Sequence, residues 1–144
     1  MKTVHMPWAR AGLILLMALC AGCASIVSPG EEKRGRALFE ATDTYRKLIR
    51  WGQYEQAAQY LRGKDEEIAR PDLERMHRYR VVGYHQADQI ASAEGTEVRA
   101  VVMIEYYEID SGVTRTLRDE QYWWYEATEK RWFLGTPMPV LGRR

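Results

Sequence analysis

Four long runs of β-forming residues fill the second half of this 144-residue chain and constrain its fold more than any other feature. They are rich in valine, isoleucine, tyrosine, threonine and tryptophan, and they cover about residues 80–92, 96–110, 113–127 and 130–136. Short turn-forming segments separate them: Ala93-Glu94-Gly95, Ser111-Gly112 and Thr128-Glu129. Because short turns join antiparallel neighbours, the runs predict a four-stranded antiparallel meander.

The residues before the strands carry helical signals. Ser28-Pro29-Gly30-Glu31 fits a capping box, with Ser28 as N-cap, and Gly52 ends or kinks the helix that follows. An apolar stripe at helical spacing runs through Leu38, Ala41, Tyr45, Leu48 and Ile49. Two shorter helices follow, one from Tyr54 to Leu61 and one through Leu73 and Met76. We therefore predict an α+β domain in two layers, with N-terminal helices packed on one face of a curved sheet.

Composition and motifs exclude several functions. Lysine and arginine number 21 against 20 acidic residues, so the chain lacks the basic surplus that bulk attraction to nucleic acid requires. No nucleophile elbow, phosphate loop or dinucleotide fingerprint is present. His77 and His85 stand at a spacing that matches no zinc motif. We therefore expect no cofactor, no bound metal and no enzymatic activity.

The first residues predict a targeting segment. Lys2 and Arg10 give a positively charged start, and an apolar run over residues 11–19 follows. This run is too short to span a bilayer. Cys20-Ala21-Gly22-Cys23 then resembles the lipobox of a bacterial lipoprotein, although Cys20 stands where leucine is usual. The resemblance implies a signal peptide over 1–22, acyl chains such as palmitate on Cys23, and a tether over 23–30. The alternative is a plain secretory signal with a chance cysteine.

The lipobox resemblance also implies a location. Ala24 occupies the position where an aspartate retains Gram-negative lipoproteins at the inner membrane. Its absence favours the inner leaflet of the outer membrane, with the domain facing the periplasm. We place one domain over residues 31–139 and a C-terminal tail over 140–144.

The order of helices and strands resembles the nuclear transport factor 2-like fold, also called cystatin-like or ketosteroid-isomerase-like. The resemblance covers about residues 31–139. It also rests on the ending Trp123-Trp124-Tyr125-Glu126 with Lys130-Arg131-Trp132-Phe133-Leu134, which is typical of the last hairpin of that family. The family implies a sheet curved into a cone, and it includes enzymes, ligand binders and assembly modules.

Hairpin geometry predicts which residues share a face. A two-residue loop at Ser111-Gly112 places Ile104 opposite Asp119 and Glu105 opposite Arg118. A loop at Thr128-Glu129 places Tyr125 against Trp132. The face predicted to lie under the helices comprises Val98, Ala100, Val102, Ile104, Tyr106, Leu117, Trp123, Tyr125, Trp132 and Leu134.

Asp119 and Gln121 lie within this apolar face, where a carboxylate must be paired, hydrogen-bonded or open to a wet pocket. A first loop at Glu94-Gly95 places His85 opposite Ile104, so that His85 and Asp119 flank Ile104 about 10 Å apart. The candidate pocket is therefore His85, Asp119, Gln121 and Tyr106, and burial is expected to raise the pKa of Asp119. In ketosteroid-isomerase-like enzymes an acid or histidine on this face transfers protons. The first strand leaves an alternative open, with Val82, Tyr84 and Ile90 pointing inward.

The opposite face is rich in aromatic side chains and arginine, a composition that favours interfaces. The candidate interface residues are Tyr107, Arg118, Tyr122, Trp124 and Phe133. The sequence thus predicts a lipid-anchored, non-enzymatic module that binds a protein partner, or a second copy, through its sheet. The alternative is a domain that binds, or less readily isomerises, a small apolar ligand around Asp119 and His85.

Overall fold

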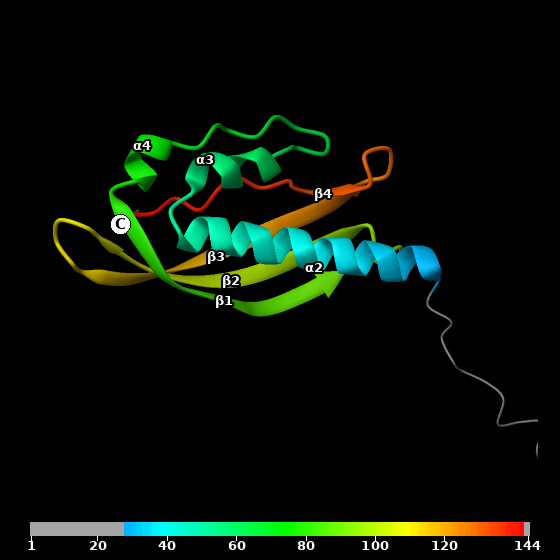
Figure 1. Ribbon diagram of the computed structural model, residues 1–144, viewed down its shortest axis with the longest axis horizontal. Coiled ribbons are helices and arrows are strands. Elements are labelled where there is room, and N and C mark those ends of the chain that lie inside the picture. The colour runs from blue at the N-terminus through cyan, green and yellow to red at the C-terminus, as the bar shows by residue number, and fades with distance from the viewer. Residues whose placement is uncertain (1–27, 143–144) are drawn as a thin grey trace, which may run out of the picture.

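A computed structural model describes residues 28–142, so the predicted signal segment and Cys23 lie outside the described residues. Helix α2 (Pro29–Arg50) precedes two short elements, α3 (Tyr54–Ala57) with the 3-10 turn η3 (Ala58–Tyr60), and α4 (Leu73–Met76). Strands β1 (Tyr79–Ala91), β2 (Glu97–Glu108), β3 (Thr114–Glu126) and β4 (Arg131–Leu134) follow (Figure 1). They form one antiparallel sheet in the order β1-β2-β3-β4. The predicted α+β class and meander are confirmed.

Helix α2 begins and ends where the sequence predicts. The Ser28 hydroxyl accepts a hydrogen bond from the Glu31 backbone N–H at 3.3 Å, and the Ser28 N–H donates to the Glu31 carboxylate at 2.8 Å. Beyond Arg50 the chain turns at Gly52, whose φ of +68° favours glycine. Within residues 28–142, no helix is long and apolar enough to span a membrane.

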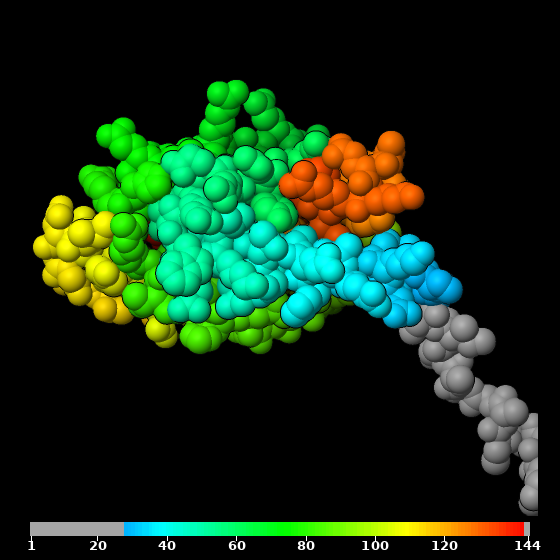
Figure 2. Space-filling view, viewed as in Figure 1, coloured from blue at the N-terminus to red at the C-terminus, as the bar shows by residue number. Residues whose placement is uncertain are grey.

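The helices cover one face of the sheet. Tyr45 and Ile49 of α2 belong to the same core as Ile104 and Trp123 of the sheet. Figure 2 shows α2 lying across this side of the molecule, between the β3–β4 hairpin and the β2–β3 loop. Every residue predicted to face the helices is buried or packs against this core.

The strand register differs from the prediction at the second hairpin. Residues 109–113 form a longer turn, closed by a hydrogen bond from the Gly112 N–H to the Glu108 carbonyl at 2.8 Å. Ile104 therefore pairs with Leu117, and Val102 pairs with Asp119. The shift is two residues, so each side chain keeps its predicted face because strand periodicity is two. The predicted Glu105–Arg118 pair is wrong, since Arg118 forms its ion pair with Glu120.

The last hairpin follows the predicted register, with Tyr125 opposite Trp132 and Trp123 opposite Leu134. The outer edge of β4 is covered by the segment after η3. Leu61 forms a parallel bridge with Leu134, and the Arg62 N–H donates to the Leu134 carbonyl at 3.0 Å. This edge of the sheet is therefore closed by the chain itself.

The C-terminal tail runs back from β4 toward α4 (Figure 1). Met138 and Leu141 are buried in the core. The Arg75 guanidinium donates to the Gly142 carbonyl at 3.0 Å and to the Leu141 carbonyl at 3.3 Å. The tail thus belongs to the folded domain instead of extending from it.

Candidate functional site

A network of buried polar side chains centres on Gln121, on the sheet face beneath α2. Its amide nitrogen donates to the Tyr84 hydroxyl at 2.7 Å and to the Asp119 carboxylate at 2.8 Å. Its amide oxygen accepts from the Trp123 indole N–H at 3.0 Å. Gln121 is 5% exposed, so these contacts replace the water that a surface amide would bind. The amide fixes the positions of the hydroxyl and the carboxyl beside it.

Burial sets the electrostatics of this network. It raises the pKa of Asp119, and the hydrogen bond from Gln121 opposes that rise only in part. Burial also raises the pKa of Tyr84. The site therefore favours neutral side chains, and the Asp119 carboxyl keeps its proton to a higher pH than a surface aspartate does.

Tyr45 adds a second hydroxyl to the network. Its side chain is 0% exposed, and its hydroxyl has no hydrogen-bond partner within the described residues. Burial raises the pKa of Tyr45 well above its ordinary value, and the nearby Tyr84 and Asp119 raise it further. We refer to Tyr45, Tyr84, Asp119 and Gln121 as the polar cluster. It offers one buried hydroxyl that no group within residues 28–142 satisfies.

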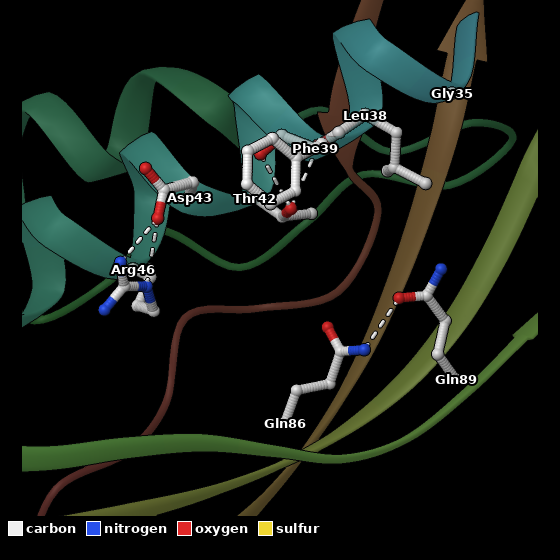
Figure 3. Close-up of a pocket in the computed structure, with 8 residues that line it drawn as sticks. All are labelled: Gly35, Leu38, Phe39, Thr42, Asp43, Arg46, Gln86 and Gln89. Carbon is white, nitrogen blue, oxygen red and sulfur yellow. Dashed lines mark hydrogen bonds and ion pairs between the residues drawn. The ribbon is translucent and has the colours of Figure 1, made fainter. Parts of the chain in front are cut away.

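A groove of about 400 Å³ lies between α2 and β1, and its lining includes no member of the polar cluster. Gln86 and Gln89 form its β1 side and point toward the helix (Figure 3). Gln86 pairs with Val102, which pairs with Asp119, so Gln86 and Asp119 share one face about 10 Å apart. The α2 side of the groove comprises Gly35, Leu38, Phe39, Thr42, Asp43 and Arg46. Groove and cluster thus occupy neighbouring parts of one sheet face.

Charged side chains stand at the helix side of the groove. Asp43 accepts hydrogen bonds from Lys47, with Nζ 2.7 Å from Oδ2, and from the Arg46 Nε at 3.2 Å (Figure 3). The bonds from Lys47 and Arg46 hold the pKa of Asp43 below its ordinary value. The Arg46 charge also acts on Tyr84, where it opposes the rise in the tyrosine pKa. Arg46 therefore lies at the rim of the groove, and its charge still acts on the polar cluster.

Two predicted pocket residues lie elsewhere. A bulge between Val81 and Gly83 shifts the first strand, so Tyr84 pairs with Ile104 in place of His85, and His85 is exposed on the outer face. Tyr106 is buried on the inner face, but its hydroxyl accepts from the Gly142 N–H at 3.2 Å. The C-terminal tail therefore covers it, about 13 Å along β2 from the level of Asp119.

Sequence reasoning placed Asp119 and Gln121 correctly and missed most of their surroundings. Tyr84 was predicted to point inward only in the alternative for the first strand, together with Val82 and Ile90. Those two side chains are exposed. Tyr45 was assigned to the apolar stripe, where its hydroxyl gave no separate signal. Arg46 and Gln86 carried no signal, because a polar residue on a helix or strand is usually solvated.

The predicted interface is half covered by the chain itself. Trp124 donates its indole N–H to the Arg62 carbonyl at 2.8 Å, and the Arg62 guanidinium lies 3.8 Å from the centre of the Phe133 ring. Both aromatic residues are buried, so their prediction as interface residues is wrong. Tyr107 and Tyr122 are half-buried and Arg118 is exposed. Among the described residues, the outer face therefore stays exposed over β1, β2 and the first part of β3.

Within residues 28–142, no three histidine, cysteine or acidic side chains come together to hold a metal ion. His77 instead contacts the Glu55 carboxylate at 2.7 Å.

Comparison with known proteins gives little beyond the fold. No protein-family model matches the chain, and no curated protein matches it. Among solved structures, it is similar to a protein from Xanthomonas campestris pv. campestris described as a "putative polyketide cyclase". The two share 17% identity, with a TM-score of 0.48, over 72% of this chain and 88% of that one. A similarity this low carries no information about the function of this chain.

Proposed function

We propose that the protein binds a small, largely apolar molecule in the groove between α2 and β1. A polar atom of that molecule would reach the polar cluster. The observation that carries the proposal is the buried Tyr45 hydroxyl, which has no partner within the described residues.

An unsatisfied buried hydroxyl costs about 1–3 kcal/mol, and a ligand oxygen placed beside it would remove that cost. The groove volume of about 400 Å³ lies in the lower part of the range for small-molecule sites, about 300–1,000 Å³. Leu38 and Phe39 supply an apolar wall, and Phe39 is 70% exposed at the opening. Buried polar groups beside an exposed aromatic wall favour a ligand that is apolar along its length and polar at one point.

Gly35 allows a direct test. A Cβ at this position would meet nothing within 4 Å, and the residue lines the groove. We expect Gly35→Leu to fill the groove and abolish binding of the fluorescent probe N-phenyl-1-naphthylamine, while Gly35→Ala binds as the natural protein does. Circular dichroism confirms that both variants fold. Undiminished probe binding by Gly35→Leu would refute the groove as the site.

A second candidate function, pairing of two copies through the open part of the outer face, has an independent observation in its favour. Consider a two-fold axis across the strands at the level of Val102. Two sheets packed face to face about this axis would place several charged or titratable side chains opposite ones of opposite sign. The register gives these pairs: Arg99 with Glu105, Arg118 with Glu120, His85 with Asp88, and the apolar Val101 with Met103.

Charge reversal separates this pairing from chance. Arg99→Glu would face Glu105 of the second copy, and like charges across an interface oppose association. The double variant Arg99→Glu with Glu105→Arg restores the pair with its signs exchanged. We expect light scattering to show a dimer for the natural and double variants and a monomer for Arg99→Glu. A natural protein that is monomeric at every concentration would refute the pairing.

We also propose, from the sequence alone, that lipid on Cys23 holds the domain at the periplasmic side of the outer membrane. Acyl chains contribute about 0.8 kcal/mol per buried methylene, so several chains anchor a protein stably. The intact mass of the full chain, isolated from a bacterial envelope beside a Cys23→Ser variant, tests this. A natural protein without added acyl mass would refute it.

A further inference from the structure

The rim of the groove suggests which ligand it binds. We infer that the ligand carries a carboxylate, which Arg46 binds at the mouth of the groove while the apolar body lies along Leu38 and Phe39. This inference rests on the proposed function, because it takes the groove as the binding site.

Arg46 is the one positively charged residue among the described residues that line the groove. Its side chain is 37% exposed, so it is accessible to a ligand that enters from solvent. A guanidinium offers two parallel N–H donors that match the two oxygens of a carboxylate. The rim therefore holds a donor pair suited to an anionic head group.

The local charge balance also favours an anion. Asp43 stands between two cations, Arg46 and Lys47, which leaves one positive charge in excess. Lys47 contacts Asp43 through Oδ2, whereas Arg46 contacts it through Oδ1. If Arg46 turns to a ligand, Lys47 still neutralises Asp43. Arg46 can therefore exchange one carboxylate for another without leaving a charge uncompensated.

The residues away from the rim disfavour a carboxylate, so the charged end of the ligand is expected at the rim. Gln86 and Gln89 line the β1 side of the groove and are hydrogen-bonded to each other at 2.8 Å, so this side carries no charge. At the cluster, Asp119 is an acid that a second carboxylate would repel once ionised. A carboxylate therefore fits at Arg46, and a neutral polar or apolar end fits toward Tyr45 and Tyr84.

Three ligands with the same alkyl chain and different heads test the inference. Decanoate, decanol and decyltrimethylammonium compete with N-phenyl-1-naphthylamine, a neutral probe, for the full chain. We expect decanoate to displace the probe at a concentration about tenfold below that of decanol, as one charge-assisted hydrogen-bonded pair would give. Decyltrimethylammonium is expected to be the weakest competitor.

Two variants identify the residue responsible. Arg46→Gln should reduce the competition by decanoate to the level of decanol and leave decanol unchanged. Arg36→Gln is the matched control, because it removes a cation of α2 that pairs with Glu32 and does not line the groove, and it should keep the preference for decanoate.

The outcomes separate this inference from the proposed function. Equal displacement by decanoate and decanol, or strongest displacement by decyltrimethylammonium, would overturn the inference that the ligand carries a carboxylate. Either result would leave the groove as the proposed binding site. Loss of the preference in Arg36→Gln would assign the effect to general surface charge and also overturn it. Failure of the probe and all three ligands to bind would overturn the groove and the inference together.

Discussion

Replacing Gln121 with leucine tests whether the polar cluster stabilises the domain as its geometry implies. Leucine keeps most of the volume and removes all three hydrogen bonds. The Trp123 N–H is then left unpaired in a fully buried residue, which costs about 1–3 kcal/mol. Each of the two bonds to Tyr84 and Asp119 contributes about 0.5–1.5 kcal/mol. We expect a loss of about 3–4 kcal/mol, a large part of the about 5–15 kcal/mol typical of a domain.

Gln89→Leu is the matched control for this substitution. Gln89 lies on the same sheet face, but it is exposed and its amide contacts only Gln86 within the described residues. We expect its effect to stay within about 0.5 kcal/mol. Urea unfolding followed by tryptophan fluorescence measures both variants, with equal m-values required for the comparison. If Gln121→Leu costs less than about 1 kcal/mol, the amide is not what holds the cluster together.

Three further substitutions test other features. Because the native Asp119 has a raised pKa, it binds its proton more tightly than in the unfolded chain, and stability falls as pH rises from about 3.9 through the native pKa. Asp119→Asn should therefore have a higher free energy of unfolding than the natural protein at neutral pH and an equal one in acid. Urea unfolding at both pH values measures this difference between the two proteins. A difference that does not change with pH would show that burial of the charge is irrelevant. Gly35→Ala should raise stability by about 0.5–1 kcal/mol, since Gly35 lies inside α2 with open space around its Cα, and an unchanged or lower Tm would contradict this. Gly142→Ala should lower stability by more than about 1 kcal/mol, because the φ of Gly142 is +75° and a Cβ there would collide with the Tyr79 hydroxyl. If calorimetry shows an unchanged Tm, the tail contributes nothing to stability.

The fold could be predicted because its signals are local and repeated. The capping box at Ser28 and the turn at Thr128-Glu129 each depend on a few neighbouring residues, and both agree with the structure. The assignment of strand faces tolerated the error at the second hairpin, since a slip of two residues preserves the side to which Asp119 points. Periodicity therefore placed the core correctly even where the register was wrong.

The site could be predicted only in part, because it depends on features that periodicity does not encode. The bulge at Val81/Gly83 puts Tyr84 on the inner face in place of His85. Gly83, a glycine inside a strand, is its one local signal, and such a glycine does not give the size of the shift. The burial of Trp124 depends on the chain around Arg62, which is distant in sequence. Contacts of this kind arise from tertiary packing, so the sequence could not show whether the aromatic outer face is exposed or covered by the chain.

The bridge between Leu61 and Leu134 has a consequence for how copies of this domain could polymerise. A sheet that extends from copy to copy without limit needs two free edges in each copy. One edge pairs with the preceding copy, and the other pairs with the following copy. Here the β4 edge is occupied by the chain itself, and β1, interrupted by two bulges, is the one strand edge left open in residues 28–142. Joining two β1 edges uses up the available backbone donors and acceptors, so growth through strand pairing stops at a pair and cannot continue into a fibril.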